Sequence, residues 1–124
     1  MKIVTQVCRF SLALALIAAA SVNAATPTTK NGITTIHIDE YNGYFAVKET
    51  LAGLKPGKYK FVVTNKANKL VGFHLQEGET HSYLDRFPIE VGQTKTAIVT
   101  LNEKGFRYRC PINPTAWIDV DVSK

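Results

Sequence analysis

The sequence contains little sulfur: two cysteines, Cys8 and Cys110, and one methionine, Met1. So few cysteines exclude a disulfide-stabilised scaffold, and their wide separation excludes a Cys-x-x-Cys redox motif. The chain also lacks a glycine-rich phosphate-binding loop and the nucleophile elbow of hydrolases. These absences argue against catalysis, and we expect a protein that is not an enzyme.

No apolar run in the sequence is long enough to span a bilayer. An uncharged run at residues 10–20 follows Lys2 and Arg9 and precedes the small residues Val-Asn-Ala at 22–24. This pattern is typical of a signal peptide, here residues 1–24, and predicts export to the periplasm. Its removal is expected to leave a flexible leader, residues 25–32, and a single domain, residues 33–124, without a membrane span.

Loss of the signal peptide would leave Cys110 as the only thiol in the chain. An unpaired cysteine in an oxidising compartment is exposed to oxidation unless it is buried, paired with another chain or bound to a metal. Metal ligation is the most informative interpretation. An inert buried thiol is the main alternative, and an intermolecular disulfide or a redox thiol is a third.

Helical periodicity is absent from the expected domain, whereas apolar and polar residues alternate in several short segments. Tyr59, Phe61 and Val63, for example, share one face of a strand that carries lysines on the other. Residues 77–88 lack clear alternation and are expected to form a long loop or a short helical turn. The pattern predicts an all-β fold, an antiparallel Greek-key sandwich of about seven strands. The predicted strands are 33–38, 44–47, 58–64, 70–76, 94–101, 105–110 and 118–122.

Cations occupy outward positions of two predicted strands, Lys58 and Lys60 on one and Arg107 and Arg109 on the other. Together they would form a basic face that attracts an acidic partner, although solvated lysines and arginines also simply keep a sheet soluble. Trp117 follows the cysteine loop and is expected to pack on the nearby prolines; the alternatives are that it shields a site from water or contacts a partner. Nucleic acid is a poor candidate, because the compartment argues against it and the aromatic residues lie with the core rather than among the lysines.

Four segments carry a resemblance to a known family. They are Lys-Pro-Gly-Lys-Tyr-Lys-Phe-Val-Val-Thr-Asn at 55–65, the histidine-bearing strand that follows, Gly-Gln-Thr at 92–94 and Gly-Phe-Arg-Tyr-Arg-Cys-Pro at 105–111. In this order, over residues 33–122, they resemble the cupredoxins, small β-sandwich proteins that bind copper. The resemblance implies a cupredoxin-like sandwich whose copper ligands are a histidine, a cysteine, a second histidine and an axial methionine.

On this resemblance Cys110 occupies the cysteine position and His74 the position of the first histidine. The positions of the second histidine and the methionine hold Asn113 and Ile118, so the ordinary blue-copper loop is absent. We expect His81 to complete the site, because a thiolate with two imidazoles suits copper and, less well, zinc. The carboxylates near His74 in the sequence are alternatives: Glu77, Glu79 and Asp85.

The resulting hypothesis is an exported cupredoxin-like protein that binds copper at an atypical site and acts in electron transfer or copper handling. A redox or copper-trafficking protein would be its partner, and its oligomeric state stays open. The alternative is a metal-free module of the same fold that docks on another exported or membrane protein. His37 is expected to be an ordinary surface residue and is left out of the site.

Overall fold

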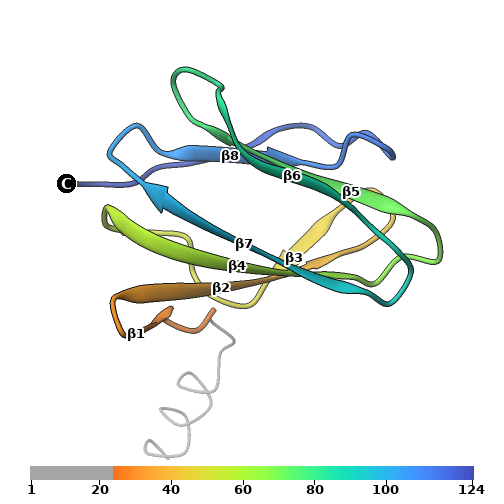
Figure 1. Ribbon diagram of the computed structural model, residues 1–124, viewed down its shortest axis with the longest axis horizontal. Coiled ribbons are helices and arrows are strands. Elements are labelled where there is room, and N and C mark those ends of the chain that lie inside the picture. Colours follow the sequence, from red (N-terminus) through yellow and green to blue (C-terminus); the bar gives the residue numbers. More distant parts are fainter. Residues whose placement is uncertain (1–23) are drawn as a thin grey trace, which may run out of the picture.

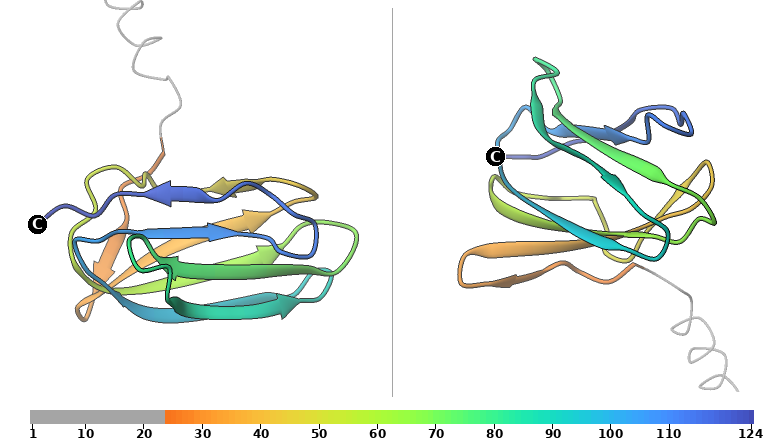
Figure 2. Two further views of the ribbon diagram at one scale, coloured as in Figure 1. Left: turned by 90° about the horizontal axis from the view of Figure 1, so that it is seen from above. Right: turned by 45° about the vertical axis from the view of Figure 1, so that its right-hand side comes forward.

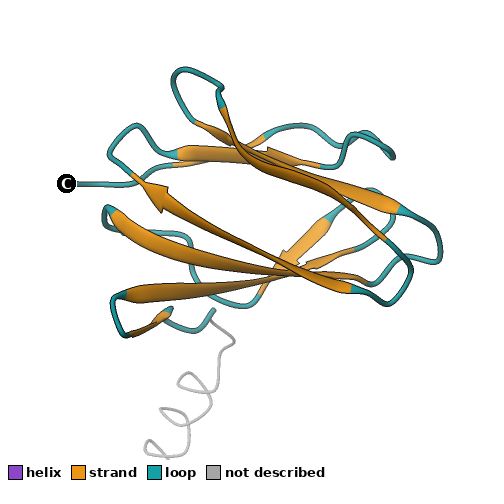
Figure 3. Ribbon diagram, viewed as in Figure 1, coloured by secondary structure: helices purple, strands orange, loops and turns teal. Residues whose placement is uncertain are grey.

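The computed structural model describes residues 24–124, so the predicted signal peptide, apart from Ala24, lies outside the described residues. The described chain consists of strands, turns and loops without a helix (Figure 3). Consequently, it contains no helix that could cross a membrane. The nine strands are β1 Thr28–Lys30, β2 Ile33–Glu40, β3 Phe45–Val47, β4 Gly57–Asn65, β5 Val71–Glu77, β6 Tyr83–Ile89, β7 Thr94–Leu101, β8 Phe106–Arg109 and β9 Ile118–Val120.

The strands form two sheets that pack face to face as a sandwich (Figures 1 and 2). One sheet has the order β1-β2-β4-β7, with β3 added on β2, and the other has the order β6-β5-β8-β9. We call the second sheet the β5–β8 sheet. The predicted all-β sandwich is therefore confirmed, and all strand pairs are antiparallel except β2–β4, which is parallel.

The core lies between the sheets because alternate side chains of each strand point inward. Phe61 of β4 and Phe106 of β8 contact edge to face across the sandwich, with ring centroids 5.3 Å apart. Phe73 and Tyr108 extend this aromatic layer within the β5–β8 sheet. All four rings are almost completely buried, so each contributes on the order of 2 kcal/mol of apolar burial to folding.

Two short segments differ from the sequence-based expectation. Residues 28–30, predicted as part of a flexible leader, form β1 and pair with β2. Residues 83–89 form β6 where a long loop or a short helical turn was predicted. The alternation is obscured there because β6 is an edge strand that accommodates Pro88, and because the β5–β6 register shifts between Leu75 and Gln76.

The loops that follow β2 and β8 lie at the same end of the sandwich (Figures 1 and 2). β2 belongs to one sheet and β8 to the other, and the inward-facing residue that ends β2 meets the one that directly follows β8 across the core. Those residues are Glu40 and Cys110. This end of the fold therefore contains a carboxyl group and the thiol.

Candidate functional site

Cys110 comes directly after β8 and continues its inward-facing row. Phe106, Tyr108 and Cys110 are each 1% or 2% exposed, whereas the intervening arginines lie on the outer face. A tight loop follows, closed by hydrogen bonds from the Thr115 amide to the Cys110 carbonyl and from the Cys110 amide to the Thr115 hydroxyl, both 3.2 Å. The strand and the loop together hold the thiol inside the sandwich.

Two backbone amides point at the sulfur. The N–H of Gly72 in β5 donates to Sγ of Cys110 at 3.5 Å, and the N–H of Asn113 donates at 3.4 Å. Hydrogen bonds of this kind favour the thiolate form. Burial nevertheless raises the pKa of Cys110, and the neighbouring Glu40 carboxyl raises it further against the effect of the two amides. Because its pKa is raised, the thiol keeps its proton at neutral pH when no metal cation is bound.

Glu40 is the feature that the sequence analysis did not anticipate. It ends β2 on the same face as Ile36 and Ile38 and is 1% exposed. Neither of its carboxyl oxygens has a hydrogen-bond partner of normal geometry. Burial raises its pKa from 4.5 to about 7, and the Cys110 thiol beside it opposes this shift only partly. A buried polar group without a partner is costly and uncommon in native proteins, so it requires an explanation.

The predicted ligand His74 faces away from Cys110. In β5 it alternates with the buried Phe73 and Leu75, so its ring lies on the outer face of the β5–β8 sheet. The Tyr83 hydroxyl and the His74 Nδ1 form a hydrogen bond of 3.2 Å there. Burial, followed by the positive charges of Arg109 and Arg86, lowers the pKa of His74.

The predicted ligand His81 is also separate from the thiol. It lies in the turn between β5 and β6 with a positive φ of 62°, and its Nε2 is 2.7 Å from Nη1 of Arg107. Within residues 24–124 there is no group of three or more histidine, cysteine, aspartate or glutamate side chains that could hold a metal ion. The structure therefore does not bring Cys110, His74 and His81 together as one metal site.

The two positions that the cupredoxin resemblance assigns to ligands have other roles. The Asn113 side-chain amide donates to Oδ1 of Asn42 and links the cysteine loop to the turn after β2. Ile118 begins β9 and is 36% exposed. His37 lies elsewhere, with its Nδ1 2.7 Å from Oε2 of Glu49.

Glu40 has a signal in the sequence that could have been used. Glu40 follows Ile36 and Ile38 in the same period-2 alternation, so it is expected to face the core. Core-facing positions are normally apolar, and a carboxylate there is an exception. Its role depended on finding what lies opposite, which only the packing of the two sheets reveals. The site that the structure assembles is therefore Cys110 with Glu40, covered by the loop at residues 111–115.

Comparison with known proteins gives a limited result. No protein-family model matches the sequence, and no curated protein matches it. Among solved structures, the chain is similar to one described as a multicopper oxidase, with 12% sequence identity and a TM-score of 0.49. The match covers 77% of this chain and 45% of that structure, so the chain spans less than half the length of the protein it matches.

Proposed function

We propose that the protein binds copper through Cys110 and Glu40 and acts in copper handling outside the cytoplasm, without bond-making catalysis. The observation that carries this proposal is the pair of carboxyl oxygens of Glu40, which are buried beside a buried thiol and have no other hydrogen-bond donor. A bound cation would compensate both groups, because ligation deprotonates them and neutralises their charge. Export is inferred from the predicted signal peptide.

The donor set fits copper in part. A soft thiolate with a carboxylate suits copper or zinc better than calcium or magnesium. The amides of Gly72 and Asn113 would stabilise the thiolate, as hydrogen bonds to a metal-bound sulfur do. The blue-copper set of two imidazoles, a thiolate and a thioether does not fit, because Asn113 and Ile118 occupy those positions.

Copper handling is favoured over electron transfer by the number of donors. A rigid site with a full ligand set minimises rearrangement between oxidation states, as electron transfer requires. Two protein donors leave the other coordination positions to exogenous ligands, so the ion would exchange more readily. When bound, copper would add one-electron redox chemistry, and electron transfer stays the second form of this hypothesis.

A copper titration of the metal-free protein, under reducing and then oxidising conditions, tests the proposal. Optical and paramagnetic spectroscopy should show saturation at one equivalent, with a signal that is lost in Cys110→Ser. Glu40→Gln should weaken binding by at least about tenfold. His74→Gln and His81→Gln serve as matched controls and should leave affinity unchanged. Binding that survives Cys110→Ser and Glu40→Gln, or that requires the histidines, would contradict the assignment.

The second candidate is a metal-free binding module. It is favoured by the lack of a three-donor group within residues 24–124 and by the basic outer face of the β5–β8 sheet. The same titration separates the candidates: failure to bind copper or zinc in either redox condition would leave the binding module as the function. If the protein bound zinc but not copper, the proposed site would stand and its metal would be zinc.

A further inference from the structure

Two arginines with a histidine between them form a row across the outer face of the β5–β8 sheet. In the strand register His74 lies directly opposite Arg86 of β6 and directly opposite Arg109 of β8. Side chains in such positions have Cβ atoms about 5 Å apart. The neighbours of His74 and Arg109 in their strands are buried in the core, and Phe87 beside Arg86 packs against it, so all three side chains of the row lie on the outer face. We call Arg86, His74 and Arg109 the cationic row.

Within residues 24–124, the cationic row has no carboxylate counterpart. The two ion pairs of this part of the chain are His37 with Glu49 and Arg107 with Asp119. Arg86 instead lies over the Tyr83 ring, with 4.4 Å between Cζ and the ring centroid. Arg109 lies over Trp117 at 4.6 Å, and its Nε has no acceptor. This unbalanced positive charge acts on His74 at the centre of the row. Burial has the largest effect in lowering the pKa of His74, and the charges of both arginines lower it further.

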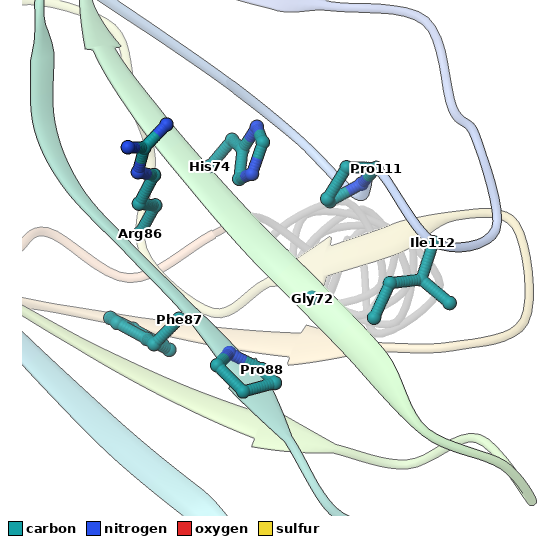
Figure 4. A pocket seen from close by; sticks show the side chains of 7 residues that line it. All are labelled: Gly72, His74, Arg86, Phe87, Pro88, Pro111 and Ile112. Atoms are coloured by element: carbon teal, nitrogen blue, oxygen red, sulfur yellow. The ribbon is translucent and has the colours of Figure 1, made fainter.

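An apolar pocket adjoins the cationic row. Its volume is about 300 Å³, and Gly72, Pro88, Pro111 and Ile112 line it together with His74 and Arg86 (Figure 4). Gly72 is two residues before His74 on the same face of β5, so the pocket lies directly beside the row. Ile112 is 48% exposed in the cysteine loop and borders the pocket. A ligand on this face would therefore meet positive charge and apolar surface side by side.

The two lysines of the basic face expected from the sequence do not extend this face. Lys58 and Lys60 belong to β4 in the opposite sheet, whereas Arg107 and Arg109 belong to β8. The single basic face expected from the sequence is thus divided between the two outer surfaces of the sandwich. Of the two outer surfaces of the sandwich, as described by residues 24–124, that of the β5–β8 sheet combines arginines with Tyr83 and Trp117, the residue types that most often dominate protein interfaces.

We propose that the outer face of the β5–β8 sheet docks an acidic segment of a partner protein, with carboxylates on the cationic row and an adjacent apolar side chain in the pocket. The arginines present planar donor groups that match carboxylates. The pocket is at the small end of the range for ligand sites, so it suits one side chain of a larger partner better than a whole ligand. The proposal does not depend on metal binding at Cys110.

The test is an NMR titration of the isotope-labelled protein with a synthetic peptide that carries two glutamates flanking a phenylalanine. The matched peptide has glutamines in place of the glutamates. Amide signals of Gly72, His74 and Arg109 should shift only with the acidic peptide, and added salt should weaken its binding. Arg86→Gln should reduce affinity by about fivefold or more, whereas Lys58→Gln, the same charge change on the opposite sheet, should change it by less than about twofold.

A second variant separates the pocket from the charge. Ile112→Ser leaves the cationic row intact and alters an exposed side chain, so the fold should be retained while peptide affinity falls. Equal losses in Arg86→Gln and Lys58→Gln would overturn the proposal by showing a general charge effect. Equal affinity for free phenylacetate would overturn it in favour of a small-molecule site. Binding to anionic lipid vesicles without binding to the acidic peptide would overturn it in favour of a membrane surface.

Discussion

The backbone amide of Gly72 donates a hydrogen bond to Sγ of Cys110, with 3.5 Å between nitrogen and sulfur. The same residue lines the apolar pocket on the outer face of the β5–β8 sheet. Because Gly72 has no side chain, only the backbone of β5 separates the buried thiol from the exposed pocket. Changes at Gly72 are therefore expected to affect both sides of the sheet.

Gly72→Ala is predicted to destabilise the protein by displacing the cysteine loop. A Cβ atom at this position would lie 3.2 Å from Cγ and Cδ of Pro111 and 3.4 Å from Cδ1 of Ile112. The backbone of Gly72 is not in the positive-φ region, so the cost arises from packing alone. We expect a loss of about 1 kcal/mol in the free energy of unfolding, measured by denaturant titration.

The steric origin of that loss can be checked in a double-mutant cycle. In a Pro111→Ala background the ring that meets the new Cβ is gone, so most of the cost of Gly72→Ala should disappear. A cost that is the same in both backgrounds would show that Pro111 is not the obstacle.

The buried carboxyl of Glu40 is predicted to make the metal-free protein less stable as pH rises. Its pKa is raised from 4.5 to about 7 by burial. The folded protein therefore holds this proton more tightly than the unfolded chain, and stability that is fully present below pH 4.5 is lost as pH rises to about 7. The shift corresponds to about 3 kcal/mol. In the presence of a chelator, Glu40→Gln should remove this part of the pH dependence in denaturant titrations.

Glu103→Gln is the matched control for that experiment, because it removes an exposed carboxyl from the turn between β7 and β8. It should leave the difference in stability between pH 4.5 and pH 8 close to that of the unmodified protein. If Glu40→Gln and Glu103→Gln behave alike, the carboxyl of Glu40 is not held protonated by burial.

The sequence predicts the strands whose alternation is regular. β7 matches residues 94–101, and β4 differs from its predicted range by one residue at each end, because each places apolar side chains on one face. The burial of Cys110 follows from the same alternation, because Cys110 continues the buried row of Phe106 and Tyr108 in β8. β6 was missed because an edge strand tolerates Pro88 and has only one neighbour to impose a pattern.

The candidate site was less predictable than the strands. The cupredoxin resemblance suggested His74, and proximity to it in the sequence suggested His81. A strand, however, sends His74 to the face opposite its buried neighbours. Glu40 is 70 positions away from Cys110 and reaches it only because the ends of β2 and β8 face one another across the sandwich. Single-strand periodicity determines which face a residue occupies but not which residue of the other sheet it meets.

Gly105→Ala is predicted to be the most damaging of the glycine substitutions considered, because two independent costs coincide. Gly105 precedes β8 with a φ of 75°, a conformation that disfavours a side chain, and a Cβ there would lie 2.5 Å from the carbonyl oxygen of Val120 in β9. Gly92 has a nearly identical φ of 76° but no atom within 4 Å of such a Cβ. Gly92→Ala should therefore cost about 1 kcal/mol in unfolding free energy, and Gly105→Ala about 3 kcal/mol or more. The difference between the two measures the close approach of β8 and β9, which sets the loop around Cys110; equal losses would mean that the clash is relieved without cost.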